Sequence, residues 1–478
     1  MEGPSSPQGL QVEHVSIVVA CCLACGVPAA MILSTAGIFY PIIASDLHVS
    51  TAEISAWMSV SMLSSAFFSP IIGNLVSRYN VRNFMLLGIV LAGMTFALFS
   101  AGTAPWMFWV AGGFGGFSLV TCLGLLPSVL VNRWFCKNVG FIIGLCTSFT
   151  GIGGVVFLAL GQGIIDAYGW RAAYLAFAVI TVVVCLPAVA LFVRDWPSDR
   201  GVRAFGEVEQ DRVELLVEPT GLSEGSGREP AVSPRLGKAH AQSGGTRCSM
   251  PPKAGLPAVA GSRNGDVAGR GVPANGHLRT AAFWLLVGSG FFMNLVCQVN
   301  GYFPLYVDWL DKQAAYGVMA GSYTTGAVLL GLSQVGNAAG KIALGAAIDL
   351  SPGKALSLLA VCGGCGTACV WLAPTTPLVT VGGLLFGVFI AGGVVLLPML
   401  VRTVFGSGEE YPVILSRVSV APTAGSAVGN VAFPLIAESA AGFDAVFALT
   451  LASVALVLVF ALAALAQRHG ANIRASIP

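Results

Sequence analysis

The chain has 478 residues, of which 55% are apolar and 10% are charged, and its formal net charge is +2. A soluble globular domain carries roughly 25% charged residues, so this composition excludes a protein whose whole surface faces water.

Twelve apolar runs are long enough to cross a membrane, since a helix needs about 20 apolar residues to span the hydrocarbon core. They lack the period-2 alternation of a barrel, and lipid cannot satisfy an unpaired backbone, so we expect helices. The predicted spans are residues 16–42, 54–77, 83–101, 107–131, 139–163, 172–193, 280–306, 319–347, 355–373, 377–401, 412–437 and 445–466.

Positive charge is distributed unevenly over the two sides of these spans. With both termini on one side, 22 of the 24 Lys and Arg residues fall on that side, and only Arg171 and Lys312 fall on the other. The positive-inside rule predicts that the termini are cytoplasmic, and we expect an integral protein of the plasma membrane. The N-terminal tail has no Lys or Arg, so we read the first apolar run as a retained helix rather than a signal peptide.

Two of the cysteine pairs have C-x-x-C spacing, Cys22 with Cys25 and Cys362 with Cys365. Both pairs lie inside apolar runs without an accompanying His or acid, where cysteine behaves as a small apolar residue. We therefore expect no metal site, and the sequence indicates no cofactor.

Residues 195–278 interrupt the apolar pattern and are rich in Gly, Pro, Ser, Arg and Glu. Such a segment buries too little apolar surface to offset the entropy of ordering, so we predict a disordered cytoplasmic linker. It separates a six-helix bundle at 14–194 from a second at 279–467, with cytoplasmic tails at 1–13 and 468–478.

Short segments of the first half recur in the second. The segment Gly37–Pro41 matches Gly301–Pro304, and Leu126-Pro127 matches Leu397-Pro398, at offsets of 264 and 271 residues. A near-constant offset indicates a duplicated unit. We predict an all-α membrane protein of twelve transmembrane helices in two pseudo-symmetric six-helix bundles, with a substrate site at their interface near the midplane.

Glycines cluster within several of the predicted helices. Because small residues let helix backbones approach closely, most of them are read as ordinary membrane packing. The group formed by Gly151, Gly153 and Gly154 in the fifth span is the best candidate for a sliding contact between the halves.

The loop after the second span reads Gly73-Asn74-Leu75-Val76-Ser77-Arg78-Tyr79-Asn80-Val81-Arg82. It resembles the major facilitator loop signature, Gly-x-Leu-x-Asp-Arg-x-Gly-Arg-Lys, with Ser77 in place of the acid. A second copy after the eighth span retains the acid. The resemblance implies a cytoplasmic latch whose charged residues pair with neighbouring helix ends, and its residues here are Gly73, Arg78, Arg82, Gly345 and Asp349. The alternative is that Arg78 and Arg82 only set the topology.

Further segments narrow the resemblance. Arg133-Trp134-Phe135 leads into the fifth span, Gly169-Trp170-Arg171 opens the sixth, Arg194–Gly201 closes it, and Phe283–Leu286 begins the seventh. In this order they are similar to the oxalate/formate antiporter and monocarboxylate transporter branch of the major facilitator superfamily. The resemblance covers both helical halves and implies the major facilitator fold.

Two cations lie within predicted spans, and no Asp or Glu lies deep in any span. At 1.5 Å per residue, Lys341 lies about 12 Å and Arg417 about 9 Å from the cytoplasmic ends of their helices. The resemblance implies a substrate-binding cation four residues before Gly345, where Lys341 stands, and a second at Arg417. We predict that the two bind a substrate carboxylate jointly, the alternative being that both snorkel to the interface.

Departures from the family pattern bear on the mode of transport. Proton-coupled relatives carry an acid four residues before this cation, where Asn337 stands here, and a lysine in the first helix, which here has no charge. This favours exchange or facilitated movement over proton symport. Polar residues in the spans are further candidates for substrate binding, although helix–helix hydrogen bonding would equally explain them: Tyr40, Gln298, Asn300, Tyr302, Gln334 and Asn337.

The sequence therefore predicts a secondary active or facilitative transporter of mono- or dicarboxylates that works by alternating access. It predicts no enzyme, because the spans contain no Ser–His or paired-Asp constellation, and no nucleotide-binding loop is present. Two alternatives remain, an efflux carrier for apolar compounds and a membrane sensor or scaffold without flux. We expect a monomer surrounded by membrane lipid, with no nucleic-acid partner.

Overall fold

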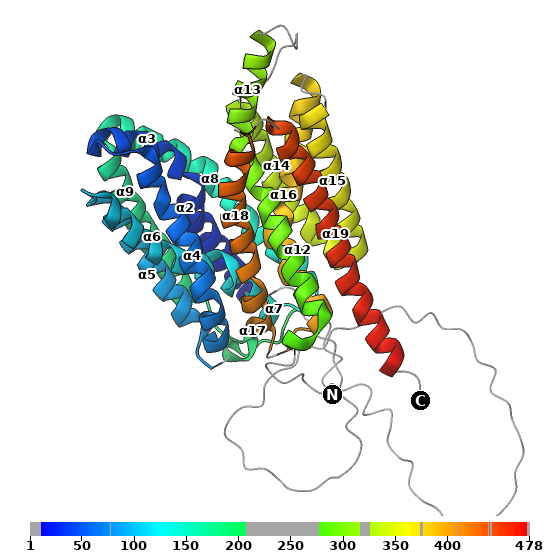
Figure 1. The fold of residues 1–478 in the computed structure, drawn as a ribbon. Helices are drawn as coiled ribbons and strands as arrows, with labels where there is room; N and C mark the ends of the chain where they lie inside the picture. The colour runs from blue at the N-terminus through cyan, green and yellow to red at the C-terminus, as the bar shows by residue number, and fades with distance from the viewer. Residues whose placement is uncertain are drawn as a thin grey trace, which may run out of the picture.

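A computed structural model describes residues 11–76, 78–206, 277–315, 326–372, 376–408, 410–437, 439 and 442–475. Within these ranges the protein is helical apart from short connections, and an isolated backbone bridge joins Phe135 to Phe205. Figure 1 shows two helical bundles side by side, one formed by the first half of the chain and one by the second.

The first bundle consists of long apolar helices, three of which contain a π-helical turn. Pro28 lies inside the first of these turns, where its missing N–H is accommodated by the irregular backbone. The elements are α1 (Val12–Ala24), η1 (Cys25–Ala29), α2 (Ala30–Ser34), α3 (Ala36–Leu47), α4 (Thr51–Val76), α5 (Val81–Ser100), α6 (Pro105–Leu119), η2 (Val120–Gly124), α7 (Leu126–Trp134), α8 (Val139–Tyr168), α9 (Trp170–Ile180), η3 (Thr181–Cys185) and α10 (Leu186–Phe192).

The second bundle repeats this arrangement with fewer interruptions. The eleventh span of the chain is divided at Ser419, which separates α17 from α18. The elements are α12 (Ala281–Cys297), η6 (Gln298–Tyr302), α13 (Phe303–Ala315), α14 (Gly326–Leu350), α15 (Pro352–Leu372), α16 (Thr376–Phe405), α17 (Tyr411–Val418), α18 (Val420–Ala437) and α19 (Gly442–Ala475).

Eleven helical units among the described residues are long and apolar enough to cross a membrane. The remaining predicted span, 319–347, begins in residues outside the described ranges and continues as α14. The predicted all-α fold of two helical bundles is confirmed. Successive spans run in opposite directions (Figure 1). We call the end of the bundles at which α1 begins and α10 ends the terminal face.

Residues 195–206 pack beneath the first bundle at the terminal face. Pro197–Arg200 form a short 3-10 helix, and the Phe205 N–H donates to the Trp134 carbonyl oxygen over 2.9 Å. The buried ring of His14 lies against Phe205, with its Nε2 3.0 Å from the Arg203 carbonyl oxygen. The predicted linker boundary at residue 195 is therefore too early, because this stretch finds hydrogen-bond and aromatic partners in the bundle. Residues 207–276 lie outside the described ranges.

Candidate functional site

A cavity of about 620 Å³ lies between the two halves. Its first-half lining comes from the α2–α3 unit, α4 and the region of η2, and its second-half lining from α12, η6, α16 and α18. Among the described residues that line it, none is Asp, Glu, Lys, Arg or His. Its polar groups are hydroxyls and amides, from Tyr40, Ser65, Ser69, Asn294, Gln298, Ser419, Thr423, Ser426 and Asn430.

Polar side chains of η6 contact α18 on the second-half wall of this cavity. Gln298 Nε2 donates to Ser426 Oγ over 3.0 Å, and Tyr302 donates its hydroxyl to the Asn430 carbonyl oxygen over 2.9 Å. Two of the predicted residues, Tyr40 and Gln298, line the cavity directly. Tyr302 does not line the cavity, but it contacts the lining residue Asn430. The sequence interpretation did not select Asn430.

The halves touch at the terminal-face side of the cavity through α8 and α14. Small residues of α8 face α14 along this interface: a Cβ on Gly140 would meet Gly345 and Asp349, a Cβ on Gly144 would meet the Lys341 carbonyl oxygen, and one on Gly151 would lie 3.1 Å from Ala338. Of the predicted glycine cluster, Gly151 alone faces the other half in this way. Gly153 and Gly154 pack against Gly26 and Ser34 within the first half.

Lys341 is buried in the α8–α14 interface, with 4% of its surface exposed. Its Nζ donates to Thr150 Oγ1 over 2.7 Å and to the Thr147 carbonyl oxygen over 3.3 Å, both on α8. Cys25 and Cys297 lie near this ammonium. Neither ion pair within the described ranges contains Lys341. A cation in this position has left the lipid interface, so the snorkelling interpretation does not fit the side chain in this conformation.

A second interface between the halves joins α4 to α17. Ser69 Oγ donates to the Ser416 carbonyl oxygen over 3.1 Å, and a Cβ on Gly73 would meet the Ser416 side chain. Arg417 follows Ser416 in the last turn of α17 and is half-buried. The two predicted cations therefore lie on different helices, Lys341 on α14 and Arg417 on α17, and neither lines the cavity.

The two interfaces are equivalent under the internal repeat. Gly73 and Gly345 are 272 residues apart, and the same separation relates Ser69 to Lys341. Ser69 bonds to α17 in the way that Lys341 bonds to α8, each through a backbone carbonyl of the other half. The duplication thus placed a neutral hydroxyl at one interface and a cation at the other.

Asp349 caps the first turn of α8 across this interface. Its Oδ1 accepts from the Gly140 N–H over 2.9 Å and its Oδ2 from the Phe141 N–H over 2.8 Å. A carboxylate at a helix N-terminus satisfies N–H groups that have no partner within the helix and interacts favourably with the helix dipole. Arg402 lies close enough to interact electrostatically with Asp349. The acid of the second loop copy thus fastens one half to the other at the terminal face.

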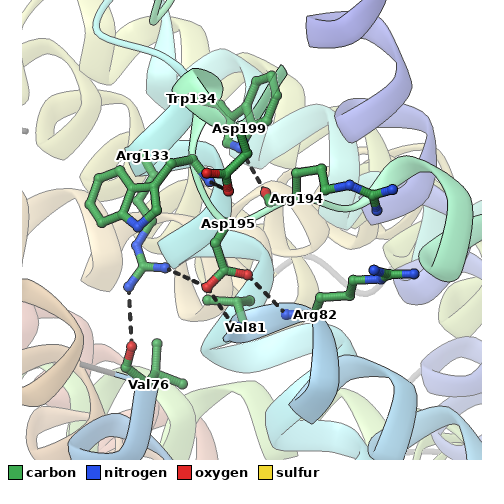
Figure 2. A network of polar contacts seen from close by, with 9 residues as sticks. Val76, Val81, Arg82, Arg133, Trp134, Arg194, Asp195 and Asp199 are labelled. Carbon is green, nitrogen blue, oxygen red and sulfur yellow. Dashed lines mark hydrogen bonds and ion pairs between the residues drawn. The ribbon is translucent and has the colours of Figure 1, made fainter. Parts of the chain in front are cut away.

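The first loop copy is fastened by an acid from elsewhere in the chain (Figure 2). Asp195 accepts from the Val81 N–H over 2.8 Å and from the Arg82 N–H over 3.3 Å, and it pairs with Arg133 over 3.3 Å. The Arg82 guanidinium donates to the Ala190 carbonyl oxygen over 2.5 Å, near the end of α10. Arg78 is exposed, and Ser77 lies outside the described residues. Asp195 therefore caps α5, within the same half, where the signature acid is missing.

The remaining predicted residues lie on α12–η6 and α14. Asn337 donates to Gln334 Oε1 over 3.3 Å, one turn from Lys341, and Ser333 donates to Asn300. None of the three predicted residues Asn300, Gln334 and Asn337 lines the cavity in this conformation. Sequence reasoning missed Thr150 and Asn294. A signal existed for Asn294, which lies four residues before Gln298 on the same helix face, but none marked Thr150 as a partner of a helix in the other half.

Comparisons with known proteins bear on this geometry. The sequence profile of the Major Facilitator Superfamily matches residues 22–327. The chain is 26% identical over 185 residues to "Monocarboxylate transporter 3" of Gallus gallus, and 27% identical over 173 residues to "Membrane sensor protein UhpC" of Escherichia coli (strain K12). These alignments cover 37% and 34% of this chain, and 32% and 38% of the two relatives.

Solved structures resemble the whole fold. A single-site variant of the fucose:proton symporter FucP of E. coli superposes with a TM-score of 0.55 at 14% identity, covering 94% of this chain and 99% of that chain. The proton:xylose symporter XylE superposes with a TM-score of 0.58 at 13% identity, covering 94% of each chain. At this level of identity the likeness shows the fold alone.

Proposed function

The chain belongs to the Major Facilitator Superfamily, and we propose that it is a secondary carrier that moves small organic anions across the membrane by alternating access. The cavity lies on one side of two interfaces that hold the halves together at the terminal face. Opening these interfaces while closing the cavity on its other side would present one site alternately to the two sides of the membrane.

Lys341 is the observation that carries the proposal for an anion. Charged residues within a membrane are costly, and they mark substrate or ion pathways. Its ammonium has three donors, and two neutral oxygens of α8 account for two of them in the described structure. When α14 separates from α8, Nζ loses both acceptors, and a carboxylate could take their place. Asn337 and Gln334, one and two turns away, would contact the rest of the anion, with Arg417 as the second cation.

We assign the terminal face to the cytoplasm on the distribution of Lys and Arg. The structure is then read as a conformation open to the outside, in a plasma membrane. Exchange or facilitated movement is proposed over proton symport, because Asn337 stands where proton-coupled carriers have an acid. The described part of the cavity lining likewise includes no Asp or Glu that could carry a proton.

The uncharged cavity supports a second candidate function, transport of a neutral polar solute. Hydroxyls and amides such as Tyr40, Gln298 and Asn430 would recognise such a compound without help from a cation. The similarity to a membrane sensor supports a third candidate, a protein that binds a solute without moving it.

One experiment separates the three candidates. Purified protein in proteoliposomes is assayed for counterflow of labelled mono- and dicarboxylates and of neutral amide and alcohol analogues of the same size. Counterflow of a carboxylate but not of its neutral analogue supports the anion carrier. Counterflow of the neutral compounds alone supports the second candidate. A solute that stabilises the protein against heat but shows no flux supports the sensor.

A further inference from the structure

We propose that Thr150 competes with the substrate carboxylate for the ammonium of Lys341, and that this exchange of partners couples anion binding to opening of the terminal face. The inference rests on the proposed function, since it assumes that an anion binds Lys341. It assigns Thr150 as a positioning residue, which acts on the substrate through Lys341.

The contact has the geometry that such a competition needs. Thr150 Oγ1 accepts from Lys341 Nζ over 2.7 Å and donates its own hydrogen to the Thr147 carbonyl oxygen over 2.8 Å. That carbonyl oxygen also accepts from Nζ, over 3.3 Å. Thr150 is 7% exposed and Lys341 is 4% exposed, so the three groups are shielded from water. Both acceptors belong to α8, and the donor belongs to α14.

The contact is specific to one conformation, because its partners lie on different halves. The backbones on which it rests are in close contact, since Gly144 and Gly151 of α8 face Lys341 and Ala338. A separation of α8 from α14 at this point breaks both hydrogen bonds at once. The ammonium then has lost its acceptors on α8, which is unfavourable unless an anion or water replaces them.

Two consequences follow from this exchange. Without an anion, the two α8 oxygens stabilise the conformation with a closed terminal face. With an anion, an ion pair between the ammonium and the carboxylate replaces a hydrogen bond from the ammonium to a neutral hydroxyl, and it adds the attraction between opposite charges. Because the anion binds the open conformation more tightly, it raises the fraction of molecules with an open terminal face.

The test measures the separation of the halves with spin labels at two exposed terminal-face positions, Tyr79→Cys and Leu350→Cys, in a background lacking other reactive cysteines. Without an anion, Thr150→Val is expected to raise the ratio of open to closed terminal face by about tenfold, the effect of losing one hydrogen bond to a charged group. Thr150→Ser, which keeps the hydroxyl, should restore the parent ratio. Thr450→Val is the matched control, because this buried hydroxyl donates to Val446 on its own helix, away from the interface.

The anion is then added as sodium oxalate or sodium lactate at millimolar concentration. The parent protein should shift toward the open terminal face, and Thr150→Val should bind the same anion more tightly, because a larger fraction already lies in the competent state. An unchanged label distance in Thr150→Val without an anion would overturn the role of Thr150. If the label distance changes in Thr150→Val but neither anion changes it in the parent protein, the role of the contact stands and the coupling to carboxylates is overturned.

Discussion

The carboxylate of Asp349 on α14 accepts hydrogen bonds from the first backbone N–H groups of α8, beginning with Gly140 at 2.9 Å. The two residues belong to different halves, so this cap is also a fastening of the terminal face. Asp349→Ala should destabilise the closed terminal face by about 1 kcal/mol, the usual effect of removing a helix cap. Label distances between positions 79 and 350 would report this as a larger open population. Asp166→Asn is the control, because Asp166 accepts from Gln162 within α8, near its other end. Equal distance distributions for Asp349→Ala and the parent would contradict the assignment.

The close approach of α8 to α14 depends on the absence of a side chain at Gly144. Gly144→Ala places a methyl group against the Lys341 carbonyl oxygen and should favour separation of the two helices by about 1–3 kcal/mol, as overpacking does elsewhere. Gly163→Ala on the same helix has open space around the added methyl and should leave the label distance unchanged. The prediction fails if both alanine variants give the same distribution.

Asp195 holds the terminal face of the first bundle together in Figure 2. Asp195→Ala removes both hydrogen bonds that cap α5 and leaves Arg133 without its ion-pair partner. The side chains of Arg133 and Asp195 are each 11% exposed. We expect the unfolding free energy to fall by about 3 kcal/mol, because removing one partner of a buried ion pair leaves the other charge uncompensated. Thermal unfolding of the purified protein measures this loss. Asp199→Ala, which removes one cap in the adjacent exposed turn, should cost far less, and equal losses for the two variants would count against the network.

The assignment of the terminal face to the cytoplasm can be tested by labelling. Cys248, in the predicted linker, should be protected from an impermeant maleimide in intact cells and should react after permeabilisation. Tyr168→Cys at the end of α8, with Cys248 replaced by serine, should react from outside, because this position is exposed at the opposite face. The reverse pattern would invert the topology.

Most of the fold could be predicted from the sequence because its determinants are local or periodic. Apolar runs of sufficient length specify the spans, and the spacing of Gly73 and Gly345 identifies the duplicated unit. Pro28 is a sequence signal for an irregular backbone near Cys25–Ala29, although it does not specify a π-helical turn. The break at Ser419 leaves the hydrophobic pattern intact, so no such signal marked it. The packing of residues 195–206 against the first bundle was also not predicted, because it depends on contacts with Trp134 and His14 rather than on composition.

The candidate site was less accessible to sequence reasoning. Depth along a helix can be counted, and Lys341 and Arg417 were found in that way. Which helix a residue faces depends on packing between the halves, so the contact of Lys341 with α8 could not be counted in advance. The role of Asp195 was hidden for the same reason, because its segment was recognised as a family feature while its partner Val81 lies more than a hundred residues earlier.

Lys341 carries the central claim, that this protein transports an organic anion. The most direct measurement is counterflow of a labelled carboxylate in proteoliposomes that contain equal amounts of the parent protein, Lys341→Gln or Lys341→Arg. Loss of a charge-assisted hydrogen bond is worth roughly 1.5–3 kcal/mol, so Lys341→Gln should weaken anion binding by about one to two decades and abolish counterflow at low anion concentration. Lys341→Arg should retain part of the activity, since it keeps the charge in a different geometry. Counterflow of the carboxylate by Lys341→Gln at the parent rate would contradict the account and leave Lys341 as a structural cation of the α8–α14 interface.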